Sequence, residues 1–234
     1  MPLSHGSDTD LDRALVSLDE KVMKIKIDQN TIRQAVQELA ERDGDLAAFY
    51  RRHGLPGLRI RPTGFGTLLK IICGQQVSTA AARAITGRLD NYASPMTPEI
   101  FLSLQETDYR AIGLSRRKEL YGRGIAEAVV SGDLNFRKIA HMDDESAIVE
   151  MIKLKGVGRW TAEVYLLFAL RRPDLWPADD LGVLNGYVGL KGLSTRPSRA
   201  DFREIGEQYR PWRSVMARML WHYANTFKGT GETN

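Results

Sequence analysis

The chain is organised around the stretch Lys153–Gly186, which has the sequence KLKGVGRWTAEVYLLFALRRPDLWPADDLGVLNG. It opens with a short turn between Gly156 and Gly158, where the missing Cβ atoms let the backbone turn sharply and approach a partner closely. The apolar residues of Arg159–Leu170 then recur at i, i+3, i+4 and i+7, the spacing of a helix with one buried face. The turn Trp176–Asp180 carries two carboxylates and opens the next helix. We therefore expect a helix-hairpin-helix unit followed by an acidic helix start.

The hairpin would place the amides of Val157, Gly158 and Arg159 at the beginning of a helix. Backbone N–H groups in the first turn of a helix have no partner within that helix. Together with the helix dipole, they form a site that binds phosphate groups well. The turn therefore indicates a hairpin that holds a phosphate through its backbone.

The composition narrows the class of protein. The chain has 234 residues, of which 43% are hydrophobic and 26% are charged, which is ordinary for a globular protein with one domain or two small lobes. The net charge of +4 permits nucleic-acid binding without establishing it. No hydrophobic run is long enough to span a membrane and no signal-peptide pattern is present, so we expect a cytoplasmic protein.

The single cysteine, Cys73, excludes both an internal disulfide and a four-cysteine iron–sulfur cluster. Four scattered histidines offer no transition-metal site. We therefore expect no iron–sulfur cluster.

Outside the hairpin the chain reads as a succession of helices. No alternating apolar pattern of strand length follows residue 30 and no βαβ rhythm is present, so we predict an all-α fold. Residues 1–30 are expected to form a polar tail or short extension. The other expected helices are Thr31–Arg42 after an Asp28 N-cap, Asp45–Arg52, Thr67–Gln75, Ser78–Leu89, Pro98–Leu104, Thr107–Ile112, Ser115–Ser131, Asp143–Ile152, Leu181–Lys191, Ala200–Gln208 and Trp212–Thr226.

Three stretches in order resemble those of the HhH-GPD superfamily of helix-hairpin-helix DNA glycosylases, most closely the alkylation-repair branch (DNA-3-methyladenine glycosylase II). The resemblance covers roughly Thr63 to Tyr223. It rests on Leu154, Gly156, Val157, Gly158, Thr161 and Ala162 in the hairpin, on Pro177, Asp179, Asp180 and Leu181, on the Ile71–Ser78 stretch IICGQQVS, and on the Pro211–Ser214 stretch PWRS.

The family fold implied by this resemblance has two helical lobes with the active-site cleft between them. Within a domain of residues 31–234, residues 66–141 would form one lobe. Residues 31–65 with 142–234 would form the other, in which the N-terminal helices pack with the C-terminal ones.

The activity implied is that of a monofunctional DNA glycosylase. Such an enzyme flips an alkylated base of the 3-methyladenine or 7-methylguanine type out of double-stranded DNA and hydrolyses its N-glycosidic bond in base excision repair, leaving an abasic site. Two alternatives stay open. One is a glycosylase of the same fold that acts on oxidised or mismatched bases, and the other is a non-catalytic helix-hairpin-helix module that only binds DNA.

Asp180 is the catalytic residue that the resemblance implies. A carboxylate at a helix N-terminus is stabilised as an anion by the helix dipole, and it could face the positive charge that develops on the sugar. A purely structural N-cap is the alternative, and Asp179 is the nearest competitor, expected to cap the turn or to contact the DNA backbone. Trp160 occupies the position where strand-cutting members carry a Schiff-base lysine, so no lyase activity is expected.

The pocket for the extruded base would be lined by Trp160 and Trp212, with Val164 and Tyr165 beside them. Aromatic walls suit electron-poor alkylated purines through stacking and cation–π attraction. Packing in the core is the alternative for each aromatic side chain. Val164 stands where the family often has a further aromatic residue, which leaves the range of lesions open.

The DNA contacts implied by the resemblance come from the hairpin and from the loop that fills the gap left by the flipped base. Gln76 would occupy that gap and could bond the base left unpaired; a simple polar turn between two helices is the alternative for this loop. Arg116–Lys118 and Arg171–Arg172 could add phosphate contacts or form an ordinary solvated surface. The expected DNA-binding set is Gln75, Gln76, Val77, Ser78, Lys155, Gly156, Val157, Gly158, Arg159 and Thr161.

No cofactor is expected to be required, and a monomer is expected. In the family, backbone carbonyls around the hairpin often hold a sodium or potassium ion. The corresponding residues here are Ile152, Leu154 and Val157.

Overall fold

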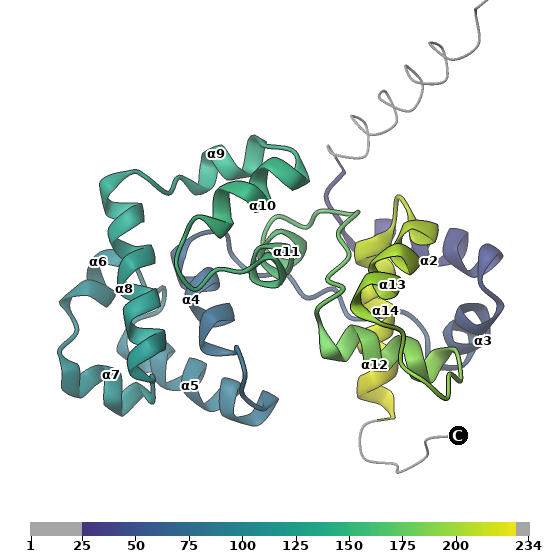
Figure 1. Cartoon of the computed structure of the whole chain (residues 1–234), viewed down its shortest axis with the longest axis horizontal. Coiled ribbons are helices and arrows are strands. Elements are labelled where there is room, and N and C mark those ends of the chain that lie inside the picture. Colours follow the sequence, from purple (N-terminus) through teal and green to yellow (C-terminus); the bar gives the residue numbers. More distant parts are fainter. Residues whose placement is uncertain (1–24, 228–234) are drawn as a thin grey trace, which may run out of the picture. The chain divides into compact units, whose positions relative to one another are not determined.

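The computed structural model describes residues 25–227, and within that range the chain is helical and has no β-strand (Figure 1). The all-α prediction is therefore confirmed. Most of the expected N-terminal extension, residues 1–24, lies outside the described residues. No described helix has the length and apolar character needed to cross a membrane.

The chain forms two compact units. Unit 1 combines the described residues up to Leu58 with those from Arg171 onward, and unit 2 runs from Arg59 to Leu170. The family resemblance implied that the lobe beginning at residue 66 ends near residue 141. The structure keeps the hairpin helices with unit 2, because α11 (Arg159–Phe168) packs against α4 (Phe65–Cys73) as well as against α10 (Asp144–Ile152).

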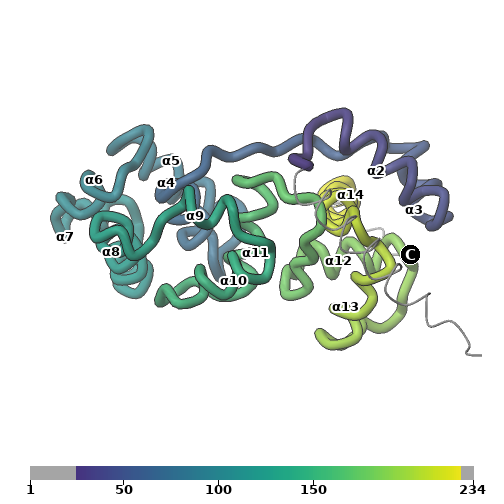
Figure 2. Tube along the Cα trace, turned by 90° about the horizontal axis from the view of Figure 1, so that it is seen from above, coloured from purple at the N-terminus to yellow at the C-terminus, as the bar shows by residue number. Residues whose placement is uncertain are grey.

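Unit 1 brings the two ends of the described chain together, since α2 packs against α14, as expected (Figure 2). Asp28 caps α2 by accepting a hydrogen bond from the amide of Thr31 at 2.7 Å. The elements of this unit are α2 (Gln29–Arg42), α3 (Gly44–His53), α12 (Leu181–Leu190), α13 (Arg199–Ile205), the 3₁₀ helix η1 (Gly206–Tyr209) and α14 (Arg213–Thr226).

The contact of α12 with α14 is the most extensive helix–helix contact in unit 1. Three glycines on one face of α12 allow it: a Cβ atom on Gly186 would collide with the backbone carbonyl of Leu220, and Cβ atoms on Gly182 and Gly189 would press on the rings of Trp221 and Tyr223. Without side chains at these positions the two backbones approach closely. The start of α12 is thereby fixed against the middle of α14.

Unit 2 is built around α8 and α4, which pack against each other. The loop Gln75–Ser78 follows α4, and the hairpin joins α10 to α11. Apart from α4, α10 and α11, its helices are α5 (Thr79–Tyr92), α6 (Pro98–Ser103), α7 (Glu106–Ile112), α8 (Arg116–Ser131) and α9 (Phe136–His141).

Helix α9 was not expected from the sequence. Its six residues are too few to show a helical period, and its one local signal is Asn135, whose side-chain oxygen accepts hydrogen bonds from the amides of Arg137 and Lys138 at 3.0 and 3.1 Å. The remaining predicted helices are present, with ends that differ from the predictions by less than one turn.

Replacing Gly186 with Ala tests the close helix contact. The added methyl group meets backbone atoms of Leu220, which cannot swing aside, so we expect a loss of about 1–3 kcal/mol in the free energy of unfolding. The matched control is Gly124→Ala on the exposed face of α8, where a Cβ atom meets nothing within 4 Å. That change should stabilise the protein by about 0.5–1 kcal/mol, because alanine is the better helix former. Urea unfolding of both variants measures the two changes in free energy. Similar changes for Gly186→Ala and Gly124→Ala would contradict the close approach of α12 to α14.

Candidate functional site

Asp180 is the N-cap of α12, and one of its carboxylate oxygens is held by three donors. Oδ1 accepts hydrogen bonds from the amides of Gly182 and Val183 at 2.8 and 2.9 Å, and from Nε1 of Trp221 at 2.9 Å. The side chain is half-buried. The helix start therefore fixes the orientation of the carboxylate, and the positive end of the helix dipole lies at the same oxygen.

Trp221 is a site residue that sequence reasoning missed. Its indole reaches Asp180 because Gly182 has no side chain; a Cβ atom there would lie 2.9 Å from Cδ1 of Trp221. No motif links position 221 to position 180, since the contact depends on how α12 crosses α14.

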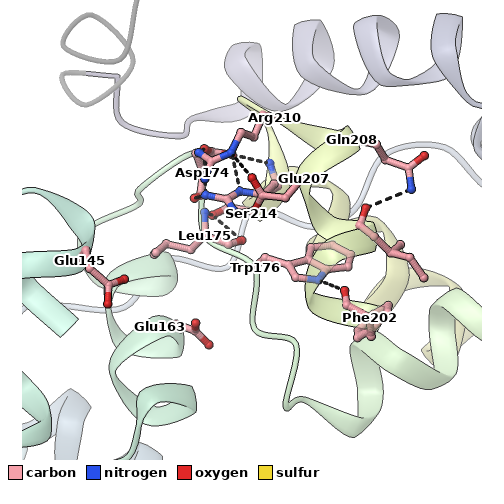
Figure 3. Close-up of polar contacts among 12 residues, drawn as sticks. Glu145, Glu163, Asp174, Leu175, Trp176, Phe202, Glu207, Gln208, Arg210 and Ser214 are labelled. Carbon is pink, nitrogen blue, oxygen red and sulfur yellow. Dashed lines mark hydrogen bonds and ion pairs between the residues drawn. The ribbon is translucent and has the colours of Figure 1, made fainter. Parts of the chain in front are cut away.

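The segment before Asp180 is also held rigidly, as Figure 3 shows. Asp174 is buried and accepts hydrogen bonds from Arg210 at 2.6 Å and from Arg213 at 2.9 Å. The amide of Leu175 donates to Oγ of Ser214 at 2.9 Å. These bonds anchor the segment to the start of α14 and to Arg210, which directly follows η1.

Two residues further on, the indole N–H of Trp176 donates to the carbonyl oxygen of Phe202 at 2.8 Å (Figure 3). A Cβ atom on Gly206 would collide with the Trp176 ring, so the ring fits closely against η1. The chain thus enters the Pro177–Asp180 turn from a fixed direction.

Asp179 lies in a different environment from Asp180. Its carboxylate forms ion pairs with Arg203 at 3.3 Å and with Arg199 at 3.8 Å, both on α13. Neighbouring carboxylates in the sequence therefore have separate partners. The helix-start position belongs to Asp180, as the motif predicted.

In the hairpin the two glycines differ. Gly156 has a φ of +91° and a Cβ atom there would collide with the ring of Tyr121, so this glycine is required by the fold itself. Gly158 has a φ of −92° and nothing within 4 Å of its Cβ position, and α11 begins there without a side-chain cap. The space beside Gly158 is open to a partner.

The side chain of Arg159 is committed within unit 2. Its guanidinium binds Glu145 at 2.8 and 2.6 Å and Glu163 at 3.0 Å, and the hydrogen bond with Glu145 raises the pKa of Arg159. Any part that Arg159 takes in phosphate binding therefore falls to its backbone amide. Lys155 is exposed beside the turn.

The two glutamines of the loop Gln75–Ser78 have different environments. Nε2 of Gln75 donates to the carbonyl oxygen of Gly156 at 3.0 Å and to Oγ1 of Thr161 at 2.9 Å, so Gln75 ties the loop to the hairpin. Gln76 is exposed and has a φ of +54°, a strained conformation for a residue with a side chain.

The other loop and hairpin residues of the expected DNA-binding set also differ in their exposure to solvent. Val77 is 38% exposed, while Ser78 caps α5 by accepting a hydrogen bond from Ala81 at 3.2 Å. Thr161 is only 1% exposed and bonds Gln75. The structure therefore gives Gln75 and Thr161 bracing roles that the sequence did not predict, and leaves Gln76 and Val77 on the surface.

The four expected pocket residues differ in burial and in partners. Tyr165 is fully buried in unit 2, where its hydroxyl oxygen accepts a hydrogen bond from the amide of Gly64 at 2.8 Å and burial raises its pKa to about 12. Trp212 is 6% exposed in unit 1, and its Nε1 donates to Glu38. Each ring packs within its own unit, and the part of both residues in a base pocket stays a prediction. Val164 is buried and Trp160 is half-buried.

The expected cation site involves backbone carbonyls of the hairpin. The carbonyl oxygen of Leu154 accepts a hydrogen bond from the amide of Val157 at 3.0 Å, and its second lone pair could serve a cation. Elsewhere, the part of the chain that the structure describes has no group of three or more His, Cys, Asp or Glu able to hold a metal ion. Burial raises the pKa of the Cys73 thiol to about 12.

The sequence of this chain is similar to those of known DNA repair proteins. Residues 69–211 match the model of the "HhH-GPD superfamily base excision DNA repair protein" family. DNA-3-methyladenine glycosylase 1 of Schizosaccharomyces pombe is 35% identical over 158 residues, which are 66% of this chain and 69% of that protein.

Two solved structures are similar as well. The S. pombe 3-methyladenine DNA glycosylase in complex with abasic DNA superposes with a TM-score of 0.75 and 30% identity, covering 83% of this chain and 97% of that one. A DNA-3-methyladenine glycosidase from Bacillus halodurans gives a TM-score of 0.70 and 30% identity, covering 83% and 90%.

The two glutamines provide a test of the loop geometry. Gln75→Ala removes two hydrogen bonds and leaves the buried Thr161 hydroxyl and the Gly156 carbonyl without their donor, so it should cost about 1–3 kcal/mol of unfolding free energy. Gln76→Ala changes an exposed side chain and should stay within about 0.5 kcal/mol of the parent. Denaturant unfolding measures both, and a Gln76 variant as unstable as the Gln75 variant would refute the assignment.

Proposed function

The chain belongs to the HhH-GPD superfamily of base excision DNA repair proteins, and on that premise we propose that it is a DNA glycosylase that excises alkylated bases of the 3-methyladenine and 7-methylguanine type. It acts on double-stranded DNA and leaves an abasic site. The observation that carries the proposal is the carboxylate of Asp180, which lies within the matched segment and is held by three N–H donors at the start of α12.

Asp180 supplies the electrostatic part of the reaction. As the bond between the base and the sugar breaks, positive charge develops on the sugar, as it does in glycoside hydrolysis. A carboxylate already fixed in place stabilises that charge without first having to reorient. The same carboxylate can orient the water that attacks the sugar. Alkylated purines are electron-poor leaving groups, so the reaction needs little help from a general acid.

The hairpin supplies backbone binding. The amides at the start of α11 are suited to hold one DNA phosphate, because the helix begins there without a side-chain cap and the missing Cβ of Gly158 leaves room for close approach. Such contacts fix the position of the duplex without reading its sequence.

Gln76 stabilises the flipped state. Its exposed side chain projects from a loop that Gln75 ties to the hairpin, so the loop keeps its shape when it enters the base stack. Strained backbone held by its surroundings is characteristic of functional loops. The amide of Gln76 can fill the gap left by the extruded base and bond the base opposite.

The enzyme acts by hydrolysis alone. A lyase step needs an amine that attacks the sugar, and Trp160 occupies the family position of that lysine. Of the lysines nearest the hairpin, Lys153 forms an ion pair with Glu150 at 2.6 Å and Lys155 lies on the exposed turn. A sodium or potassium ion at the carbonyls of Ile152, Leu154 and Val157, a monomeric state and a cytoplasmic location remain predictions.

Asp180→Asn tests the assignment of the catalytic residue. Asparagine caps helices as well as aspartate does, and its side-chain oxygen can accept the same three hydrogen bonds, so the fold should survive while the charge is lost. We expect single-turnover release of 3-methyladenine from methylated DNA to fall by at least about 10²- to 10³-fold. Binding to a duplex with an abasic site should be nearly unchanged.

Two further variants sharpen that experiment. Asp179→Asn removes the neighbouring charge, which pairs with α13 arginines, and should have a much smaller effect on base release. Trp221→Phe keeps a ring against Gly182 but loses one donor to Asp180, so its rate should lie between those of the parent and Asp180→Asn. If Asp179→Asn proved the more damaging variant, the catalytic role would belong to Asp179. A parent protein that bound DNA yet released no base would be a binding module.

Treatment with borohydride during the reaction tests the hydrolytic mechanism. Borohydride traps a Schiff base between an amine and the sugar, and no such intermediate should form here. We expect no covalent protein–DNA adduct on a denaturing gel, and product strands that stay intact until alkali cleaves them at the abasic site. A trapped adduct that disappears in Lys155→Gln would instead identify a lyase.

A further inference from the structure

The first turn of α8 carries three consecutive basic residues that have three different environments. Arg116 forms an ion pair with Glu119 at 2.9 Å, and Glu119 is buried. Lys118 donates from Nζ to the carbonyl oxygen of Cys73 at 2.7 Å, at the end of α4. Arg117 donates from Nε to the hydroxyl of Tyr121 at 2.7 Å. Arg116 is thus paired with a carboxylate and Lys118 is bonded to a backbone carbonyl, whereas the partner of Arg117 is a neutral hydroxyl.

Tyr121 places Arg117 beside the hairpin. The Tyr121 ring occupies the space in which a Cβ atom of Gly156 would lie, so ring and hairpin backbone are in direct contact. The guanidinium carbon of Arg117 lies 5.6 Å from the centroid of the same ring. One aromatic ring therefore separates the hairpin backbone from the charge of Arg117.

The charge of Arg117 is exposed to solvent and is not neutralised by an acidic side chain. Among residues 25–227, the ion pairs of the structure include those of Arg116 and Arg110 but none of Arg117. A guanidinium that is held in one place and still carries its full charge is well suited to bind a phosphate. Because Tyr121 already orders the side chain, little rotamer entropy is lost when a ligand binds.

We propose that Arg117, held by Tyr121, binds a second phosphate of the DNA backbone beside the one that the hairpin amides hold. The inference rests on the proposed function in so far as its ligand is DNA. The two contacts differ in kind: the hairpin offers uncharged N–H groups, whereas Arg117 offers a charge that displaces a counterion from the DNA. Arg117 is thus a side chain that should make DNA binding sensitive to salt at this face of unit 2.

The salt dependence of binding to an undamaged duplex tests this contact. Each phosphate neutralised by the protein adds about 0.9 to the slope of log K against log salt concentration. Arg117→Gln should lower the steepness of this slope by about 0.9. The variant should therefore bind more weakly than the parent at 50 mM salt, and the ratio of the two affinities should be about 3.5-fold smaller at 200 mM salt. The control Arg110→Gln removes the same charge from α7, where Arg110 pairs with Glu106, and should leave the slope unchanged.

A third variant tests the role of the tyrosine. Tyr121→Phe keeps the ring against Gly156 but removes the hydroxyl that holds Arg117. Its slope should equal that of the parent, while its affinity should fall by about 2- to 10-fold because the arginine must now be ordered on binding. Parental affinity in Tyr121→Phe would overturn the bracing role. An unchanged slope in Arg117→Gln, or an equal change in Arg110→Gln, would overturn the phosphate contact.

The outcome can be told apart from a failure of the proposed function. Base release from methylated DNA by the parent protein tests the proposed glycosylase activity. The salt dependence of binding to undamaged DNA tests the phosphate contact of Arg117. A parent that excises 3-methyladenine while Arg117→Gln keeps the parental slope would refute only the second phosphate site. A parent that binds DNA without excision, and loses slope on Arg117→Gln, would refute only the glycosylase.

Discussion

The close approach of α12 to α14 is the contact on which the orientation of the Asp180 carboxylate depends. Gly182, Gly186 and Gly189 let the two helix backbones meet, and the indole of Trp221 is then near enough to bond Asp180. If a side chain stood between the helices, the cap of α12 would keep its two amide donors and lose the third. The orientation of the carboxylate is therefore a result of helix packing as much as of the local turn.

The same device recurs throughout the chain. An aromatic ring occupies the place of a missing Cβ where Tyr121 meets Gly156, where Trp221 meets Gly182, where Tyr223 meets Gly189, and where Trp176 meets Gly206. Interiors are densely packed, so a ring against bare backbone leaves little freedom for either partner. In unit 2 this contact fixes the hairpin, and in unit 1 it fixes the segment that leads to Asp180.

The sequence predicted the features that are encoded locally. Helix starts followed from N-cap residues such as Asp28, the hairpin followed from its two glycines, and Asp180 followed from the order of the motifs. The donor Trp221 could not be found in this way, because it is 41 residues from Asp180 along the chain. The different roles of Gln75 and Gln76 were equally hidden, since two identical side chains differ only in which one faces the hairpin. The roles of Tyr165 and Trp212 do not follow from the sequence either, because helical spacing identifies a buried face without saying whether a core or a ligand covers it.

The cap at Asp180 has a consequence for how such proteins diverge. All three hydrogen bonds that this side chain makes through Oδ1 need an acceptor oxygen, and none of them needs a negative charge. Asparagine at this position would preserve the same three hydrogen bonds. If Asp180 is the catalytic residue, as proposed, a single substitution by asparagine would remove catalysis and keep the cap of α12. Among related chains, the identity of this one residue would then report whether excision is still under selection.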